Sequence, residues 1–394
     1  MAASVDPGRR LAADGEVVRW SGKDVTAVSV ALRLLDLRQA ASDDDGYPLA
    51  RASVMNLLVY ASEPSQIDVA IATVDELALR HPSRAIVVAS RPGKTFALDA
   101  EVAIHRHPLA THGLVYERAI LRPTGADPEG LDTLVIPLLI PHLQSFLWWL
   151  AKPNPHDPAL QSLAGICDRL IIDSSLGSAS ELHDISERLA PPGAADPVTP
   201  GFGRLVMGDM TWTRLDAFRG ALARIFDEGD RAEFLDGLQS VAITGCRGLT
   251  HPVSPAEVLF AGWLSSRLGC TAPTWVPNGV SMRHGRAGHR VIFSFGGVRG
   301  YRSPRPSDVH YPIDGIRLVA GLGRRTLDLE LRCQGDGGRL TVKESGHPLV
   351  RRAVPMAQPA ETEVLSRELA RLGRDRIYEE AMASAALIQT GLTG

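Results

Sequence analysis

Uninterrupted apolar runs alternate with amphipathic segments in the first half of the chain. The runs predict strands that are buried on both faces, at residues 53–61 (SVMNLLVYA), 84–89 (RAIVVA) and 170–173 (LIID). Between the first two, residues 66–80 have helical apolar spacing, with Ser65 as N-cap and His81-Pro82 as the stop. Strand, helix and strand with short links predict a right-handed parallel βαβ unit.

Further elements extend this pattern. Val25, Val28, Leu32 and Leu35 recur at helical steps and predict a helix over residues 24–37. The remaining predictions are an edge pair (96–105 and 113–121), a helix bent near two prolines (131–140), a strand (144–150) and helices (158–167 and 180–189). The first half is therefore expected to be an α/β domain with a mainly parallel sheet.

The pattern changes after residues 191–203 (PPGAADPVTPGFG), which have the composition of a linker. Beyond it, alternating strands are expected at 238–244, 290–295, 315–320, 326–333 and 339–342, and helices at 212–226, 255–268 and 361–387. We expect a flexible N-terminus (1–22), an α/β domain (23–190), this linker, and an α+β domain with an antiparallel sheet and a C-terminal helix (204–394).

Composition excludes several classes of function. The net charge is −3, from 42 basic and 45 acidic side chains, so no nucleic-acid partner is expected. The most apolar stretch, residues 134–150, is shorter than the ~20 residues of a membrane span and contains Pro137, Pro141 and His142. The N-terminus lacks the apolar core of a secretory signal, and we expect a cytoplasmic protein without a membrane partner.

Metal and redox sites find little support in the sequence. The four cysteines, Cys167, Cys246, Cys270 and Cys333, are widely spaced and form no C-x-x-C pair. Reduced structural thiols are the simpler interpretation, although a fold could still bring two of them together. His105, His107 and His112 cluster near one strand end without a carboxylate or thiol at ligand spacing, which favours a polar strand end over a metal site.

The sequence motifs that bind nucleotide cofactors are incomplete in this chain. Gly93-Lys94-Thr95 resembles the end of a phosphate loop, but Val88 occupies the place of the required first glycine. The Gly201/Gly203 and Gly321/Gly323 pairs lack the third glycine of a dinucleotide fingerprint. No cofactor is therefore expected.

Two groups of residues remain as candidate sites. Asp173, Ser174 and Ser175 follow a buried strand, where α/β sheets bind ligands, or they cap the next helix. Trp212, Thr213 and Arg214 open a helix and serve either core packing or partner contact, because Trp and Arg are enriched at interface centres.

Four segments in order resemble the OpcA family, the glucose-6-phosphate dehydrogenase assembly proteins of cyanobacteria and actinobacteria. They are His81-Pro82-Ser83-Arg84, the apolar run that leads to Trp148-Trp149, residues 168–174 (DRLIIDS) and residues 209–215 (DMTWTRL). The resemblance spans about residues 50–270 in detail and the rest in layout. This chain carries His142 where the family usually has an acidic residue, and its cysteines match no assignable pattern.

The resemblance implies a non-catalytic protein that binds glucose-6-phosphate dehydrogenase and favours its active oligomeric form in the oxidative pentose phosphate pathway. Tentative contact residues are then Trp212, Thr213 and Arg214. The other motif positions are expected to define the fold: His81, Pro82, Arg84, Trp148, Trp149, Asp173 and Ser174.

Two alternatives stay open. A sugar-phosphate-binding protein or enzyme would use the strand end at Asp173 to Ser175 together with Arg84 or Arg169. A structural scaffold would bind neither the sugar phosphate nor the dehydrogenase.

Overall fold

Two eight-stranded sheets form the centre of the computed structural model, one in each of two compact units. Neither unit is a single stretch of chain. The first contains Met1–Asp173, Ile185–Gly208 and Glu361–Gly373, and the second contains Ser174–Asp184, Asp209–Ala360 and Arg374–Gly394. The residues that the structure describes are 16–43, 53–106, 115–177, 181, 184–185, 205–245, 253–296, 311–334, 337–356, 358–371 and 373–393.

The expected linker at residues 191–203 lies outside the described residues, as does most of the expected helix at 180–189. Residues 16–22, expected within a loose N-terminus, form a strand that pairs antiparallel with the edge of the first sheet. The pairing explains the difference, because an edge strand needs no strong apolar pattern of its own when its backbone is hydrogen-bonded.

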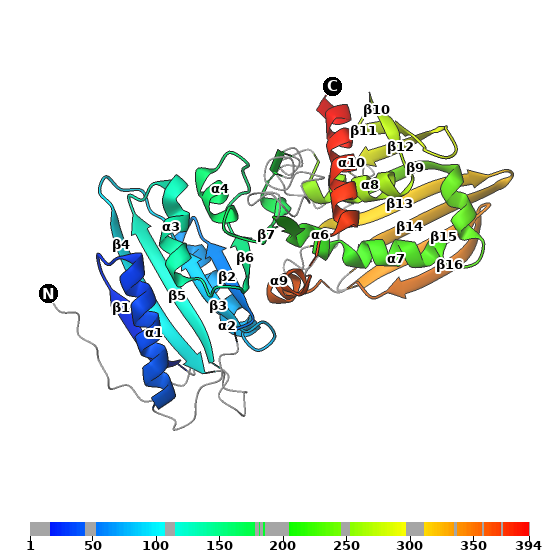
Figure 1. The fold of residues 1–394 in the computed structure, drawn as a ribbon. Coiled ribbons are helices and arrows are strands. Elements are labelled where there is room, and N and C mark those ends of the chain that lie inside the picture. Colours follow the sequence, from blue (N-terminus) through cyan, green and yellow to red (C-terminus); the bar gives the residue numbers. More distant parts are fainter. Residues whose placement is uncertain are drawn as a thin grey trace. The chain divides into compact units, whose positions relative to one another are not determined.

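The first sheet is mainly parallel, as expected (Figure 1). Its strand order is β1-β4-β5-β3-β2-β6-β7-β8; the first two contacts are antiparallel, and the next four are parallel. The strands are β1 (Glu16–Gly22), β2 (Met55–Tyr60), β3 (Ser83–Val88), β4 (Ala97–Arg106), β5 (Val115–Thr124), β6 (Gln144–Trp149), β7 (Arg169–Ile172) and β8 (Val206–Asp209).

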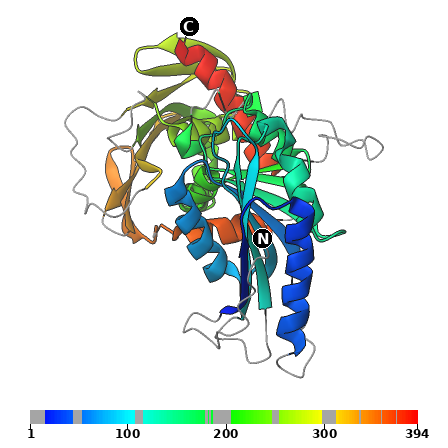
Figure 2. The ribbon, with the colours of Figure 1, turned by 90° about the vertical axis from the view of Figure 1, so that its left-hand side faces the viewer.

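Helices cover both faces of this sheet, which Figure 2 shows edge-on. One face carries α1 (Ala27–Asp43), α3 (Leu131–Val135) and α4 (Pro158–Ala164), and the other carries α2 (Pro64–Leu77) and α9 (Glu361–Ala370). The short 3-10 helices η1 (Pro128–Gly130) and η2 (Ile136–Leu138) flank α3. Coverage on both faces explains why strands such as β3 are buried along their whole length.

The buried face of α1 differs from the face that the periodicity suggested. Val28, Leu32 and Leu35 are 59%, 57% and 55% exposed, whereas Val30 and Leu34 are buried. The helix is apolar on two opposite sides, so periodicity alone predicts the helix correctly but does not tell which side meets the sheet.

The second sheet is mainly antiparallel, again as expected, with one parallel contact between β9 and β12. Its order is β10-β11-β12-β9-β13-β14-β15-β16. The strands are β9 (Leu238–Gly245), β10 (Thr271–Val276), β11 (Gly279–Arg283), β12 (Arg290–Phe295), β13 (Ile313–Leu322), β14 (Arg325–Gln334), β15 (Gly337–Glu344) and β16 (His347–Val354). Three of these strands, β10, β11 and β16, were not predicted from the pattern.

Helices lie over one face of the second sheet (Figure 1). α8 (Pro255–Arg267) packs against α10 (Arg376–Thr393) and β9, and α10 also meets β10 and β11. α7 (Asp216–Phe226) follows the short α6 (Met210–Arg214) and precedes η5 (Arg231–Gly237), which packs on β13.

The expected single helix over residues 361–387 is two helices in different units, α9 in the first and α10 in the second. Asp375 starts α10, because its Oδ1 accepts a hydrogen bond from the Tyr378 amide at 3.0 Å. The apolar periodicity continues through residues 361–387. It therefore does not reveal that one helix ends, that a second helix begins at a cap, and that the chain passes from the first unit to the second.

Candidate functional site

The strand order of the first sheet reverses at β2, which has β3 on one side and β6 on the other. Doubly wound sheets bind ligands beyond the carboxyl ends of their strands at such a point. Tyr60 ends β2 and Trp149 ends β6, and their rings stack with centroids 4.1 Å apart. Trp149 is completely buried, so aromatic side chains of the chain itself pack at the ends of these two strands.

Gln66, in the first turn of α2, closes the same place from the helix side. Its Oε1 accepts hydrogen bonds from the amides of Ser62 (2.7 Å) and Glu63 (3.1 Å). Its Nε2 donates to the carbonyl oxygen of Leu150, just after β6, at 3.0 Å. The side chain thus links the loops that follow β2 and β6.

A dinucleotide site needs glycines in the loop after the first strand, so that backbone amides can approach a pyrophosphate. Residues 61–66 (ASEPSQ) contain no glycine, and the carboxylate of Glu63 adds negative charge where an anion would bind. Tyr60, Gln66 and this loop were missed as a site from the sequence, although the glycine-free loop after a buried strand could have indicated that this position does not admit a pyrophosphate.

Arg84 lies at the opposite end of the strands, near the start of β3. Its Nε donates to Glu117 Oε2 at 2.5 Å, and its Nη1 donates to the Leu138 carbonyl oxygen at 2.8 Å. Both charged side chains of this pair are buried. Arg84 therefore ties β3 to β5 and η2, and it does not share an edge of the sheet with Asp173.

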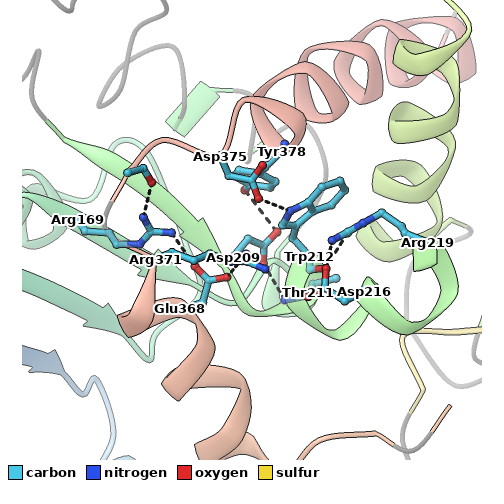
Figure 3. Close-up of polar contacts among 11 residues, drawn as sticks. Arg169, Asp209, Thr211, Trp212, Asp216, Arg219, Glu368, Arg371, Asp375 and Tyr378 are labelled. Atoms are coloured by element: carbon cyan, nitrogen blue, oxygen red, sulfur yellow. Dashed lines mark hydrogen bonds and ion pairs between the residues drawn. The ribbon is translucent and has the colours of Figure 1, made fainter. Parts of the chain in front are cut away.

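Arg169, at the start of β7, is the centre of a second buried ion pair (Figure 3). Its Nη2 donates to Glu368 Oε2 at 2.9 Å, and its Nη1 donates to the Gly373 carbonyl oxygen at 3.0 Å. Arg371 donates to the other Glu368 oxygen at 2.7 Å. These bonds attach α9 to the first sheet. They also occupy Nη1 and Nη2 of Arg169, which the sugar-phosphate alternative would require for binding a ligand.

Trp212 is buried within the second unit. Its indole Nε1 donates to Asp375 Oδ2 at 2.9 Å, and its ring lies against that of Tyr378 with centroids 5.5 Å apart (Figure 3). The guanidinium of Arg219 stacks on the indole at 3.2 Å from its centroid. Trp212 thus joins α6, α7 and α10.

Thr213 is also buried, whereas Arg214 is half-exposed. Among the three residues expected at a partner contact, only Arg214 can reach another protein without rearrangement. A direct contact through this segment stays a prediction.

Asp209 organises the segment before α6. Its Oδ1 accepts hydrogen bonds from the amides of Ser174 (3.1 Å) and Thr211 (3.0 Å), and Tyr378 Oη approaches its Oδ2 at 3.4 Å. Ser174 is buried by this arrangement, whereas Asp173 is half-exposed. The Ser174 backbone is held by Asp209, which agrees with a structural role for this motif.

His81 and Pro82 connect α2 to β3. The imidazole Nε2 of His81 lies 2.8 Å from Ser366 Oγ on α9, and the Pro82 carbonyl oxygen accepts a hydrogen bond from the Val54 amide at 2.8 Å. Burial lowers the pKa of His81, and the neighbouring Arg80 lowers it further. Both residues support the first unit, as their motif position suggested.

Of the three clustered histidines, only His105 lies among the described residues. His105 is buried and stacks on Tyr116 at 4.9 Å, while His107 and His112 lie outside the described residues. Burial, followed by the charge of Arg118, lowers the pKa of His105 to about 4. No group of three or more potential ligands occurs among the residues with a described position.

Three cysteines are described, and all are free thiols: Cys167, Cys270 and Cys333. Burial raises the pKa of the Cys167 thiol, with Asp168 adding to the effect, and raises the pKa of Cys270 to about 11. A raised pKa keeps these two thiols protonated and slow to react. Cys246 lies outside the described residues, and redox control through it stays untested.

These features define a class: a protein with an α/β unit and an α+β unit, in which the loop after the first parallel strand, β2, has no glycine. Family models identify it further. Residues 74–189 match the glucose-6-phosphate dehydrogenase subunit N-terminal domain of the OpcA family, and residues 206–382 match its C-terminal domain. The chain belongs to the OpcA family.

Curated relatives agree with the family models. The chain is 29% identical over 289 residues to the putative OxPP cycle protein OpcA of Synechococcus elongatus, covering 69% of this chain and 59% of that protein. It is 25% identical over 330 residues to the protein of the same name from Nostoc punctiforme, covering 80% and 66%. The chain thus spans about three fifths to two thirds of the length of these relatives.

Among solved structures, levoglucosan dehydrogenase in complex with NADH and L-sorbose aligns with a TM-score of 0.43 and 11% identity, over 86% of this chain and 97% of that one. A likeness this loose supports no conclusion about fold or activity. Among the described helices, none has the length and apolar character needed to cross a membrane.

Proposed function

We propose that this protein is a non-catalytic partner of glucose-6-phosphate dehydrogenase that binds the enzyme and favours its active oligomeric form. Membership in the OpcA family supports the partner. The observation that carries the non-catalytic role lies where β2 and β6 end: Tyr60 and Trp149 stack on each other, Gln66 links the loops that follow these strands, and the loop after β2 has no glycine to admit a pyrophosphate. The proposal places the protein in the cytoplasm with the enzyme, in the oxidative pentose phosphate pathway.

Activation of this kind requires only that the partner bind one state of the enzyme better than another. A tenfold change in substrate affinity corresponds to about 1.4 kcal/mol of differential binding. An interface of ordinary size, about 1,600 Å² in total, is sufficient for this difference. No cofactor, metal, nucleic acid or membrane is part of the proposal.

The test is the kinetics of the cognate dehydrogenase with and without a molar excess of this protein. We expect the KM for glucose 6-phosphate to fall severalfold and the two proteins to elute together in gel filtration. Unchanged kinetics together with separate elution would refute the proposal. This protein alone should not reduce NADP⁺, and measurable reduction would refute the non-catalytic role.

Substitution of Arg214 addresses the expected contact segment. Arg214→Ala should leave the unfolding midpoint close to that of the wild type, since the side chain is half-exposed. If Arg214→Ala activates the dehydrogenase as well as the wild type does, this segment lies outside the interface. A thermal shift with glucose 6-phosphate alone would instead favour the sugar-phosphate alternative.

A further inference from the structure

Among the described residues, helices cover one face of the second sheet and none covers the other. On β14, Leu327, Leu329 and Leu331 are buried, while Asp328 and Glu330 between them are partly exposed. Strand residues alternate between faces, so the leucines point to the helix-covered side and the acids to the opposite side. We call the side that carries Asp328 and Glu330 the open face.

The open face is basic. Register across the sheet assigns to it seven basic and two acidic side chains among the described residues, whereas the whole chain carries −3. They are Arg283, Arg290, Arg317, Arg332, Arg339, Lys343 and Arg351, with Asp328 and Glu330. The face therefore has a charge opposite in sign to that of the protein as a whole.

Part of this charge is already paired. Arg317 donates to both Asp328 carboxylate oxygens at 2.9 Å, and Arg332 Nε donates to Glu330 at 2.6 Å. Lys343 lies opposite Asp328, and its charge adds to the lowering of the Asp328 pKa after that of Arg317. Arg339 and Arg351, both exposed, form no ion pair with any described residue.

The open face has an uncharged strip near its centre, beside the Arg317–Asp328 pair. The strip contains Ser240 and Ala242 on β9, Ile292 and Ser294 on β12, and Val319 on β13. Ile292 is 44% exposed. Protein–protein interfaces are depleted in charge at their core and enriched in arginine, and an uncharged strip with arginines around it fits that composition.

We propose that the open face is a docking surface for an acidic surface of another protein, which, if the proposed function holds, is glucose-6-phosphate dehydrogenase. Uncompensated Arg339 and Arg351 at the rim steer an acidic partner, and the uncharged strip comes into contact when it docks. A nucleic acid fits less well, because Asp328 and Glu330 neutralise arginines within the face and the chain as a whole is acidic.

The experiment reverses the charge of the rim. The variant Arg339→Glu/Lys343→Glu/Arg351→Glu alters three exposed side chains and should lower the unfolding midpoint only slightly, through the carboxylate that Lys343→Glu places opposite Asp328. The matched control, Arg224→Glu/Arg286→Glu/Arg324→Glu, makes the same change in net charge at exposed positions of the same unit that are off the open face. Association with the dehydrogenase is measured for all three proteins at low and high salt.

We expect association of the rim variant to be about tenfold or more slower at low salt, the difference to shrink as salt rises, and the control to stay within about twofold of the wild type. If the wild type binds and the rim variant binds equally well, this surface is wrong while the proposed function stands. If the wild type itself does not bind, the proposed function fails.

Two other occupants are distinguished in the same experiment. Sedimentation of the protein alone tests a second copy: self-association that only the rim variant loses would overturn the proposal. Binding of duplex DNA by the wild type and the control, but not by the rim variant, would also overturn it.

Discussion

The two sheets have the same number of strands but bury them differently. The first has helices on both faces, so its parallel strands are enclosed, and Tyr60, Trp149 and Gln66 pack where β2 and β6 end. The second has helices over one face (Figure 1), and among the described residues the other face carries an excess of basic side chains. The contrast is that the first sheet is enclosed by its own helices, whereas the second carries the face that we propose for docking.

The largest difference in unfolding free energy should come from truncating one apolar residue in each sheet to alanine. Trp148→Ala removes a buried indole from the first sheet, and we expect the free energy of unfolding to fall by about 3–5 kcal/mol. Ile292→Ala on the open face should cost less than about 1 kcal/mol, since the side chain is nearly half exposed. Urea denaturation measures both, and equal losses would contradict the contrast.

The buried ion pair provides the next test. Glu368→Gln leaves Arg169 buried without its counter-charge, and we expect a loss of about 3 kcal/mol in unfolding free energy. Glu363→Gln on the same helix removes an exposed carboxylate that pairs with Arg80 and should leave the midpoint unchanged. If the two variants unfold at the same urea concentration, the Arg169–Glu368 pair does not hold α9 to the first unit.

One buried group in each unit should make the free energy of unfolding depend on pH, and the two dependences should have opposite directions. His105 is held neutral in the folded first unit with a pKa of about 4, below its ordinary 6.5, so the unfolded chain binds more protons between these values. Its contribution, about 2–3 kcal/mol, is complete above pH 6.5 and is lost as pH falls towards 4. His105→Phe keeps an aromatic ring on Tyr116 and should flatten this dependence in urea titrations at several pH values.

Glu257 in the second unit should change the free energy of unfolding with pH in the opposite direction. Burial raises the pKa of its carboxyl group above the ordinary 4.5, against hydrogen bonds from Ser254 and others that lower it. The folded state therefore binds more protons, and its contribution is complete below pH 4.5 and is lost as pH rises through the folded pKa. An unchanged pH dependence in Glu257→Gln would show that this group does not titrate on unfolding.

The smallest effect should come from the start of α10. Asp375→Ala removes the acceptor for Trp212 Nε1 and for the Tyr378 amide, and we expect a loss of about 1–2 kcal/mol. Asp375→Asn, which keeps one oxygen acceptor, should lose less. Thermal unfolding followed by tryptophan fluorescence measures the difference, and a larger loss in Asn than in Ala would contradict the assignment.

The sequence predicted strands in both sheets, and most directly those that are enclosed on both faces. The runs at residues 53–61 and 84–89 became β2 and β3, because a strand buried on both faces is apolar whatever its neighbours are. The two-sided helix α1 and the break before α10 were not predictable in the same way. Their outcomes depend on which surface packs against the helix and on a cap hidden inside an apolar periodicity.

The site depended on contacts between distant parts of the chain. The motif residues Trp148, Trp149 and Arg84 are all buried, and their expected role in defining the fold stays a prediction. The link between Arg169 and Glu368 joins residues 199 positions apart, and no local pattern reports it. The glycine-free loop at residues 61–66, which does not admit a pyrophosphate, was in principle visible in the sequence.

The return of residues 361–373 to the first unit has a consequence during synthesis. A ribosome that has translated all eight strands of the first sheet has not yet translated α9, so Arg169 must wait for Glu368 until the second sheet is also complete. We expect nascent chains stalled after residue 360 to leave the first unit open to protease, and the released 394-residue chain to protect it. The first unit, whose strands are translated first, is thus completed only after residues close to the end of the sequence have been translated.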